Sequence, residues 1–469
     1  MRDRFCTLFL TVAFLVSAHL RAQLPPAQLL SPSMIEQIDG IATKALADSG
    51  TSSLSIAVVK DEKIAYVKAY GNARLAPLTP ATPEMRYSTG SVSKQFMACA
   101  ILLLAQEGKL SLDDPVSRFL PSLTRAREIT IRELLSHTSG YQDYYPLDYV
   151  APFMQQPVTA EEILTRWARK PLDFDPGTKW QYSNTNYVVA GRVLETIAGE
   201  PFFAFLQQRI FGPLGMASVI DLDEQPLGAA DAAGYTRFGL GPARPVAPEG
   251  RGWLFAAGEL AMTARDLAVW DQSLLEGKLL QPALLDAMIT PVRLKNGAPQ
   301  GYALGVGVSN AAGYPKLSHG GAVSGFVSDN VVWLGEGAAV AALTNMDGSR
   351  VAASVANQIG PLLLAEKQDP QAAAQLDQAR RVFSGLQEGK IERSILSPDA
   401  DAYFTTQVLT DAASSLKPLG APTSFEPVAF GMRGGMSFRG FNLKFAAGKS
   451  LELTTFYTPD GKIAEYLIQ

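Results

Sequence analysis

The 469-residue sequence predicts an α/β fold: an antiparallel sheet flanked by helices, an inserted all-helical region, and a small C-terminal α+β domain. Two observations lead to this class. Strand patterns stand near both ends of the first 365 residues with helical patterns between them, so we expect the early and late strands to join in one sheet. A second group of strand patterns follows a polar stretch near residue 370. We therefore expect domains at 23–368 and 369–469.

The first 140 residues contain three helical patterns and one hairpin. Spacing of apolar residues predicts a helix over 32–49, and two strand patterns around the turn at 60–63 predict a hairpin. A long apolar run predicts a buried helix over 91–107, and 129–140 reads as a short helix that ends in a loop. Helical patterns then alternate with turns over 159–215, so this middle region is expected to be mostly helical.

Strand patterns return in the second half, after the composition shifts to Gly, Pro and Ala near residue 234. They predict further strands of the main sheet, followed by a helix over 349–365 that packs beside the first one, and the strands are expected at 302–308, 315–320, 326–334 and 338–345. Residues 366–380 are polar and predict a linker or a leading helix. Four more strands, expected in the C-terminal domain, lie at 424–432, 436–445, 450–458 and 462–468.

Residues 1–22 have the layout of a secretory signal peptide. Arg2 and Arg4 precede the apolar run CTLFLTVAFLVSA, which ends in small residues. A run of roughly 13 apolar residues is shorter than the ~20 that span a bilayer, which argues against a permanent anchor. We expect a periplasmic or secreted protein without a stable membrane span after cleavage.

Charge and composition exclude several classes of partner. The formal net charge of −4 argues against a nucleic-acid ligand. Cys99, the one cysteine outside the signal, lies in an apolar helix and is expected to be buried without a disulfide partner. His137 and His319 form no Cys/His cluster with zinc spacing, so we expect no metal site, and we expect no cofactor.

Ser91 and Lys94 stand three residues apart where the apolar helix begins. On a helix this spacing places the hydroxyl and the amine on one face. Taken alone, Ser91 could be an N-cap and Lys94 a surface charge. Two distant stretches provide partners: Tyr182-Ser183-Asn184 after a Pro-Gly turn, and His319-Gly320-Gly321 at the end of a strand pattern.

These three motifs, in this order, resemble the serine β-lactamase and penicillin-binding-protein superfamily, specifically its class C β-lactamase, D,D-carboxypeptidase and esterase branch. The resemblance covers about residues 32–365. It implies a β-lactamase/transpeptidase-like α/β/α sandwich beside an all-helical subdomain, with the site at their junction. Substrates of the branch include small esters, D-amino-acid peptides and β-lactams.

The resemblance assigns Ser91 as the nucleophile, with Lys94 and Tyr182 as the groups that move its proton. Lys94 can act as a base only if burial lowers its pKa from ~10.4 toward ~7. Which of Lys94 and Tyr182 is the formal base stays open, and both would also activate the deacylating water. Asn184 would bind substrate and Lys94, or alternatively cap the helix at 186–198.

In the third motif, Gly321 allows close approach of substrate and the Ala322 N–H would complete an oxyanion hole with that of Ser91. His319 stands where the branch's β-lactamases usually keep lysine. As a substrate-binding residue it would become charged toward pH ~6 and then favour substrates with a carboxylate. The alternative is a plain strand residue. His137 and Ser183 are expected to be structural.

Three further features bear on the site. The AAGE segment departs from the branch's usual double glycine, and we interpret Glu259 as a solvent-facing helix cap. Selectivity is expected from loops 142–158 and 235–255. A group of tyrosines either lines the substrate site or lies on the surface, and its members are Tyr141, Tyr144, Tyr145 and Tyr149.

The sequence therefore predicts an exported serine hydrolase that forms an acyl-enzyme on Ser91 and acts on small esters or on peptides or amides of D-amino acids. One alternative is a class C-like β-lactamase, which His319 weakens. The other is a non-catalytic binding protein on the same fold, which the intact Ser91, Lys94 and Tyr182 argue against. The oligomeric state stays open.

Overall fold

The computed structural model describes residues 29–145, 147, 149–239, 241–311, 314–364, 371–446 and 448–469. The expected signal peptide at 1–22 lies outside these residues, as does 366–370 of the expected linker. The chain divides into two compact units, Met1–Leu364 and Ala365–Gln469, each with its own hydrophobic core.

A seven-stranded antiparallel sheet organises the first unit, in the order β3-β2-β1-β12-β11-β10-β9. The N-terminal hairpin pairs with the last strand of the unit through the register Leu54↔Thr344, so the expected union of early and late strands is confirmed. The strands are β1 (Ser53–Lys60), β2 (Lys63–Leu75), β3 (Leu78–Pro80), β9 (Gly307–Ala311), β10 (Tyr314–Val323), β11 (Phe326–Trp333) and β12 (Ala338–Thr344).

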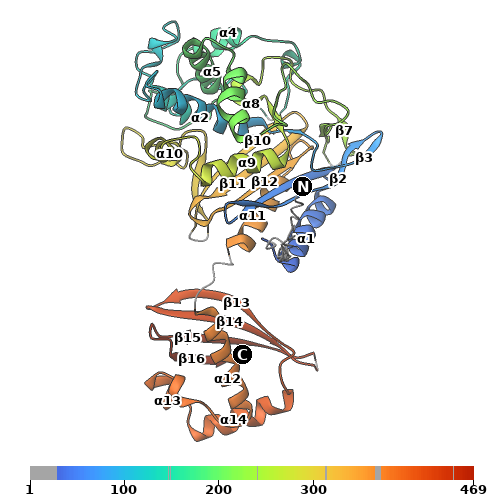
Figure 1. Cartoon of the computed structure of the whole chain (residues 1–469), viewed down its shortest axis with the longest axis vertical. Coiled ribbons are helices and arrows are strands. Elements are labelled where there is room, and N and C mark those ends of the chain that lie inside the picture. The colour runs from blue at the N-terminus through green and yellow to red at the C-terminus, as the bar shows by residue number, and fades with distance from the viewer. Residues whose placement is uncertain are drawn as a thin grey trace, which may run out of the picture. The chain divides into compact units, whose positions relative to one another are not determined.

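Helices cover both faces of this sheet, which gives the α/β/α sandwich (Figure 1). On one face α1 (Pro32–Ser49) packs beside α11 (Val351–Leu364), and both contribute to one apolar cluster with the sheet. On the other face α9 (Ala264–Leu275) lies against β1 and β12, and the buried α2 (Ser93–Gln106) belongs to the larger cluster on that side. The predicted layer order is confirmed.

The inserted region forms a helical subdomain on the α2 side of the sheet (Figure 1). Its helical elements are α3 (Ile131–Leu135), α4 (Ala160–Ile163), the π-helical turn Leu164–Ala168, α5 (Asn184–Ala198), α6 (Phe202–Leu206), the π-helical turn Gln207–Phe211, α7 (Gly212–Leu214) and α8 (Phe255–Gly258). Helix α10 (Pro282–Ile289) follows α9, and the 3₁₀ turns of the unit are Gly90–Val92, Val116–Arg118, Pro152–Gln155 and Leu334–Glu336. Two small sheets join these parts, one of β4 (Tyr87–Ser88), β8 (Leu260–Met262) and β5 (Ile220–Asp221), the other of β6 (Tyr235–Thr236) and β7 (Arg244–Pro245).

One strand expectation is wrong in position. Residues 302–306 form no strand, apart from an isolated bridge between Tyr302 and Gly307. Gly305 has a φ of +77°, and a Cβ atom there would lie 2.8 Å from the Lys94 carbonyl oxygen. The chain therefore bends against α2 before β9 begins. The alternation of apolar and polar residues that predicts a strand cannot reveal this contact between Gly305 and α2.

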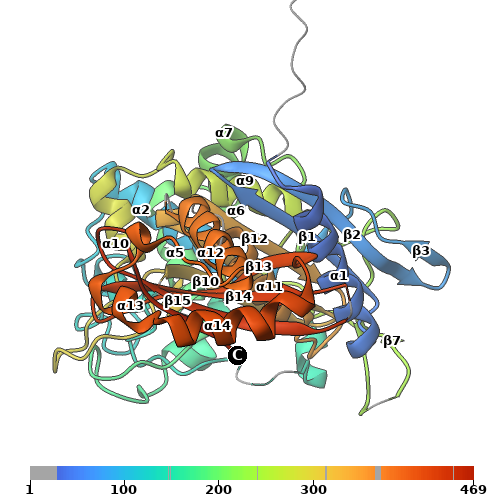
Figure 2. The same cartoon turned by 90° about the horizontal axis from the view of Figure 1, so that it is seen from below.

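The second unit has a four-stranded antiparallel sheet in the order β13-β14-β15-β16, as expected. Helix α12 (Ala372–Gln387) contributes Val382, Phe383 and Leu386 to its core, and Figure 2 shows this helix with α14 and the sheet. The remaining elements are α13 (Pro398–Tyr403), the 3₁₀ turn Arg393–Ile395, α14 (Thr406–Leu416), the 3₁₀ turn Lys417–Leu419, β13 (Ser424–Arg433), β14 (Met436–Lys444), β15 (Ser450–Tyr457) and β16 (Ile463–Ile468).

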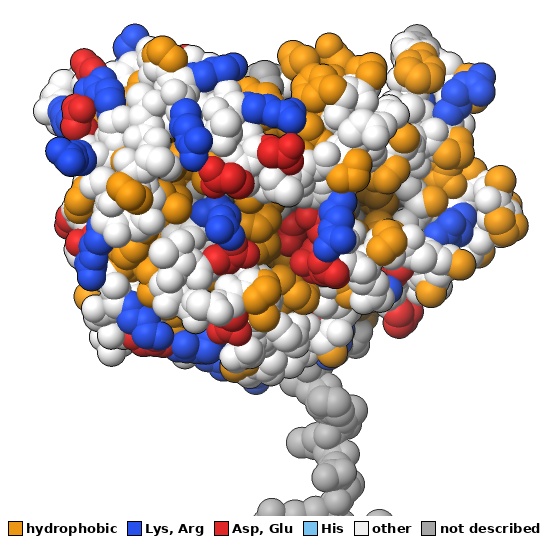
Figure 3. Space-filling view, turned by 90° about the horizontal axis from the view of Figure 1, so that it is seen from above, with side chains coloured by type: hydrophobic (Ala, Val, Ile, Leu, Met, Phe, Trp, Pro, Cys, Tyr) orange, Lys and Arg blue, Asp and Glu red, His pale blue; other side chains and the backbone are white. Residues whose placement is uncertain are grey.

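The surface bears on the expected partners. Basic and acidic side chains are interspersed over the face seen in Figure 3, without the continuous basic stripe that nucleic acids attract. Across the described residues, no helix combines the length and apolar character needed to traverse a bilayer.

Candidate active site

Ser91 lies in the 3₁₀ turn Gly90–Val92, immediately before α2. The predicted helix therefore begins as a 3₁₀ turn, in which residues i and i+3 also share a face. Gly90 has a φ of +51°, and a Cβ atom there would lie 3.0 Å from the Ala322 nitrogen. A glycine is needed because the turn must bring Ser91 close to β10.

Lys94 is fully buried and has an acceptor for each of its three hydrogens. Its Nζ lies 3.0 Å from Ser91 Oγ, 2.8 Å from Asn184 Oδ1 and 2.7 Å from the Ala257 carbonyl oxygen. Three separate segments thus fix one amine: the start of α2, the start of α5 and the end of α8. The surface-charge alternative for Lys94 is wrong.

Burial lowers the pKa of Lys94 to about 7, and the nearby Asp143 carboxylate opposes this shift. Transfer of an ammonium out of water disfavours its charged form, whereas a neighbouring carboxylate favours it. About half of the Lys94 side chains are therefore neutral near pH 7. This is the condition under which a lysine can take a proton from a hydroxyl.

Tyr182 precedes α5, and Lys94 Nζ lies 5.1 Å from the centre of its ring. The His137 ring packs on the other side, with the two ring centres 4.2 Å apart. Burial raises the pKa of the Tyr182 phenol above its ordinary value, and the Ser91 hydroxyl beside it lowers that pKa by less. Tyr182 is therefore a neutral phenol near pH 7, in contact with the same hydroxyl as Lys94.

Asn184 is the first residue of α5, and the N-cap is Ser183. The alternative of Asn184 as an N-cap is therefore wrong. Its Oδ1 accepts from Lys94, while its backbone N–H and Nδ2 donate to Asp143 Oδ1 at 2.9 and 3.2 Å. The amide is thus oriented from both ends, with its oxygen toward the amine.

His319 lies in β10, and its buried side chain packs against the rings of Tyr182 and Tyr302. Its Nε2 lies 2.8 Å from the Tyr302 hydroxyl, and its Nδ1 lies 2.6 Å from the Gly320 carbonyl oxygen. The carbonyl can only accept, so Nδ1 carries the proton and Nε2 accepts from Tyr302. Both nitrogens of the ring are satisfied within the protein.

Burial, reinforced by the Lys94 charge, lowers the pKa of His319 to about 3. The imidazole therefore stays neutral at pH 6, and the expectation that it charges in this range is wrong. The physical reason is that an imidazole enclosed by tyrosine rings has no carboxylate to stabilise its cation. His137 is also buried, and Ser183 N donates to its Nδ1 at 3.2 Å, in keeping with a structural role.

Gly321 and Ala322 form the wall of β10 that faces the Ser91 turn. A side chain at Gly321 would overlap the Thr89 carbonyl oxygen, and the Ser328 hydroxyl donates to that same oxygen at 2.7 Å. Strand β9 pairs with β10 only as far as Ser318, so the β10 edge beyond that point lies beside the turn. The Ala322 N–H is thereby brought next to the segment that carries Ser91.

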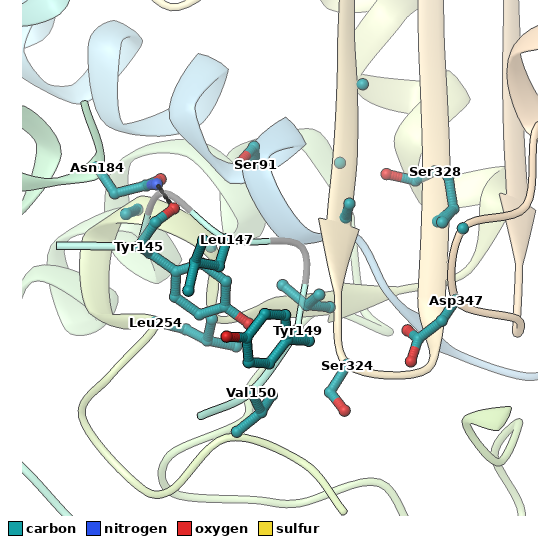
Figure 4. A pocket seen from close by; sticks show the side chains of 18 of the residues that line it. Ser91, Tyr145, Leu147, Tyr149, Val150, Asn184, Leu254, Ser324, Ser328 and Asp347 are labelled. Atoms are coloured by element: carbon teal, nitrogen blue, oxygen red, sulfur yellow. Dashed lines mark hydrogen bonds between the residues drawn. The ribbon is translucent and has the colours of Figure 1, made fainter. Parts of the chain in front are cut away.

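An open pocket of about 1230 Å³ lies in front of Ser91. In Figure 4 one side of it shows Tyr145, Leu147, Tyr149, Val150 and Leu254, and the other shows Ser324, Ser328 and Asp347. Both loops expected to set selectivity contribute to the lining. Of the four tyrosines, Tyr144, Tyr145 and Tyr149 line the pocket, whereas the Tyr141 hydroxyl donates to the Thr124 carbonyl at 3.1 Å.

The charged side chains of this lining are acidic. Asp143, Asp329 and Asp347 belong to it, and none of the described residues that line it is Lys or Arg. Burial raises the pKa of Asp329 to about 6, so at pH 7 it is mostly ionised. A substrate carboxylate would meet no fixed cation at this surface.

The comparisons with known proteins identify the family of this chain. The family model described as Beta-lactamase matches residues 38–362, well over half of the chain. The chain belongs to the β-lactamase family. It is thereby a member of the serine β-lactamase and penicillin-binding-protein superfamily, a group of serine hydrolases, as the three motifs predict.

Within the β-lactamase family, a D-aminopeptidase from Brucella anthropi is 29% identical over 278 residues, covering 58% of this chain and 52% of the relative. The chain thus spans about half of that enzyme. A D-stereospecific amidohydrolase from Streptomyces sp. has a TM-score of 0.60 at 28% identity, over 67% of this chain and 96% of that one. The octameric penicillin-binding protein homologue from Pyrococcus abyssi shares the fold, with a TM-score of 0.63 at 20% identity, over 93% and 100% of the two chains.

Asp143, Tyr302 and the Ala257 carbonyl complete this β-lactamase-family site, and sequence reasoning missed all three. Asp143 stands in the tyrosine-rich loop without a motif around it, and a carbonyl has no sequence signature. Tyr302 lay in a segment interpreted as a strand. For Asp143 and Ala257 the one signal was their proximity in sequence to Tyr144 and Glu259, and Tyr302 had no such neighbour.

Proposed function

We propose that this protein is an exported serine hydrolase that forms an acyl-enzyme on Ser91 and acts on small esters or on amides and short peptides of D-amino acids. The observation that carries the proposal is the hydrogen-bond pattern of Lys94. A neutral amine has two hydrogens and one lone pair. Asn184 Oδ1 and the Ala257 carbonyl can only accept, so they take the two hydrogens and leave the lone pair for the Ser91 hydroxyl.

In this mechanism Lys94 is the base for acylation, because its pKa of about 7 lets it be neutral while the Tyr182 phenol stays protonated. The Ser91 proton passes to Lys94 as Oγ attacks the carbonyl carbon. Tyr182 gives its proton to the leaving group and regains one from Lys94. The same two groups then activate a water to release the acyl group.

The oxyanion of the tetrahedral intermediate is expected between the N–H groups of Ser91 and Ala322. Support for this comes from the close approach of β10 to the Gly90–Val92 turn, which requires glycine at 90 and 321. Backbone donors at fixed positions stabilise developing charge without reorganising during the reaction.

The acidic lining selects among substrate classes. A carboxylate beside the reacting carbonyl, as in β-lactams and D-alanyl peptides, would be repelled by ionised Asp329 and would meet further acidic side chains in the lining. A free amino group, as in a D-amino-acid amide, would be attracted by them. The names of the D-aminopeptidase and D-stereospecific amidohydrolase relatives fit this second class. The lining therefore disfavours the class C-like β-lactamase alternative.

A substrate panel tests the proposal on one preparation: a p-nitrophenyl ester, a D-amino-acid p-nitroanilide with a free amino group, its N-acetylated form, and a chromogenic cephalosporin. We expect turnover of the ester and the free amino anilide, and little turnover of the cephalosporin. Preference for the cephalosporin would support the β-lactamase alternative instead. No turnover and no fluorophosphonate adduct on Ser91 would support a binding protein.

Export to the periplasm or the medium rests on the pattern of residues 1–22. Fractionation of expressing cells, with mass spectrometry of the N-terminus, tests it. A cytoplasmic protein that retains residues 1–22 would contradict export without affecting the hydrolase proposal.

A further inference from the structure

Glu259 is the residue where the structure departs most from the sequence interpretation. It is the C-cap residue of α8, as a helix cap was expected, but it is only 1% exposed, so the expectation that it faces solvent is wrong. The chain turns inward there, because the next residues form β8, the central strand of a small buried sheet. Both carboxylate oxygens of Glu259 are buried without a hydrogen-bond partner.

Two further carboxylates converge on Glu259. Asp221 ends β5, and Asp223 lies two residues further along the same turn. One oxygen from each of the three side chains lies within 4.8 Å of the others. Strands β5 and β8 are paired, with Asp221 opposite Leu260, so the sheet itself brings the cluster together.

Backbone donors orient two of the three carboxylates. Asp223 N donates to Asp221 Oδ1 at 2.8 Å, and Gly252 N lies 3.0 and 2.9 Å from the two oxygens of Asp223. The nearby Arg251 forms its ion pair with Glu224. In the ion pairs of the described residues, none of the three clustered carboxylates has a lysine or arginine partner.

Asp221 and Glu259 are buried, Asp223 is half-buried with the Arg251 charge nearby, and no basic side chain among the described residues is paired with the cluster, so the cluster is electrostatically incomplete. Burial, and repulsion by Asp221 and Asp223, raise the pKa of Glu259 well above its ordinary value. Such a group either holds a proton or waits for a counter-ion. The orphaned oxygens of Glu259 point to the second, because a carboxyl fixed in place by a shared proton alone would still lack a donor for its other oxygen.

We propose that Asp221, Asp223 and Glu259 form a binding site for one Ca²⁺ ion. The ligands are all oxygens. Hard divalent cations prefer oxygen ligands, whereas zinc and softer metals more often bind nitrogen or sulfur. Calcium takes about six to eight oxygen ligands in flexible geometry and accepts several carboxylates around one ion. Magnesium usually keeps several of its waters and is held by one or two carboxylates, so three protein carboxylates favour calcium.

The position of the site gives the ion a role in holding the catalytic segment. Ala257, which accepts from Lys94, lies two residues before Glu259, and Gly258 between them lines the pocket. The ion would join the β5 turn, the loop at Gly252 and the end of α8. It would thereby stabilise the segment that positions Lys94, without contacting substrate.

The experiment uses the full-length protein, treated with EDTA and exchanged into calcium-free buffer. Calorimetric titration with CaCl₂ should give one ion per chain, and the midpoint of thermal unfolding should rise by about 5 °C at 100-fold excess over Kd. Terbium provides a second readout, because Trp253 follows Gly252 and can sensitise its luminescence at the site. A larger response to Mg²⁺ than to Ca²⁺ would overturn the assignment to calcium.

Matched variants locate the site. Glu259→Gln keeps the size of the side chain and should weaken Ca²⁺ binding at least about tenfold, while Glu224→Gln, an exposed carboxylate next to Asp223, should leave it unchanged. If Glu259→Gln does not fold, Asp221→Asn provides the same test. Saturable binding that survives both cluster variants, or no binding to wild type, would overturn the proposal.

Discussion

The side chains of Lys94 and Glu259 are both buried and ionisable, but they differ in their hydrogen-bond partners. The Lys94 amine, held by the Ala257 carbonyl, has an acceptor for every hydrogen and is balanced by nothing more than the Asp143 carboxylate nearby. Glu259 has two buried oxygens and no donor for either. The Lys94 amine can therefore carry a proton while it is uncharged, whereas the Glu259 carboxylate needs a cation from outside the chain.

The two groups also differ in what a change of protonation does to their neighbours. Loss of a proton from Lys94 leaves both carbonyl acceptors satisfied and frees a lone pair for Ser91. Loss of a proton from Glu259 adds a negative charge beside two other carboxyl groups. Proton transfer is therefore easy at the first group and costly at the second unless an ion is bound.

Removal of the nucleophile or of the amine should have the largest effect. We expect Ser91→Ala and Lys94→Ala each to lower kcat/KM for a p-nitrophenyl ester on the order of 10⁴-fold or more, with the fold retained for Ser91→Ala. Intact mass after fluorophosphonate treatment should show one adduct on wild type and none on Ser91→Ala. Lys109→Ala, at an exposed lysine, is the control and should keep wild-type activity.

Tyr182→Phe tests whether Tyr182 and Lys94 share one path for the Ser91 proton. We expect a loss of roughly 10²- to 10⁴-fold alone, and little further loss when it is combined with Lys94→Ala, because both groups serve the hydroxyl of Ser91. Tyr141→Phe, whose hydroxyl bonds outside the pocket, is the matched control. Losses that add fully in the double variant would contradict a shared proton path.

The pH dependence of kcat/KM tests whether the amine of Lys94 works uncharged. Its pKa of about 7 lies below the ordinary lysine value, so lowering the pH through 7 charges the base. Activity on a neutral ester should therefore fall about tenfold per pH unit below about 6.5 and level off above about 8. A profile that stays flat down to pH 5 would show that another group takes the proton.

His319 should contribute no pH dependence of its own above pH 5, because its pKa is about 3. The ratio of kcat/KM for a cephalosporin to that for a neutral ester should change with pH to the same extent in wild type and in His319→Gln between pH 6 and 8, because any rise toward pH 6 comes from protonation of Asp329, whose pKa is about 6. A rise of this ratio toward pH 6 that His319→Gln removes would restore the residue to carboxylate recognition.

The smallest effect is expected from deletion of the second unit. Both buried groups of the comparison lie in the first unit, and the two units have separate cores. A chain that ends at Gln368 should keep kcat/KM for small esters within about threefold and bind Ca²⁺ as the full chain does. Insoluble or inactive protein would show that the units depend on one another for folding or activity.

Much of the fold could be predicted because it follows from local patterns. The period-3.6 spacing of α1, the hairpin at Lys60–Lys63 and the four strands of the second unit depend on neighbouring residues alone. The contact of Ser91 with Lys94 is equally local, since three residues of helical chain bring the two side chains together. These features need no knowledge of the rest of the molecule.

The tertiary structure decided which buried groups find partners, because partners come from distant segments. Lys94 meets Asn184 and the Ala257 carbonyl, 90 and 163 residues away in sequence. His319 turns toward Tyr302, and Glu259 enters the interior because β8 pairs with β5. Burial and the dielectric environment set the pKa of each group, and both arise only when distant segments of the chain pack together. No motif could therefore show that Lys94 has a hydrogen-bond partner for each hydrogen and that Glu259 has no donor.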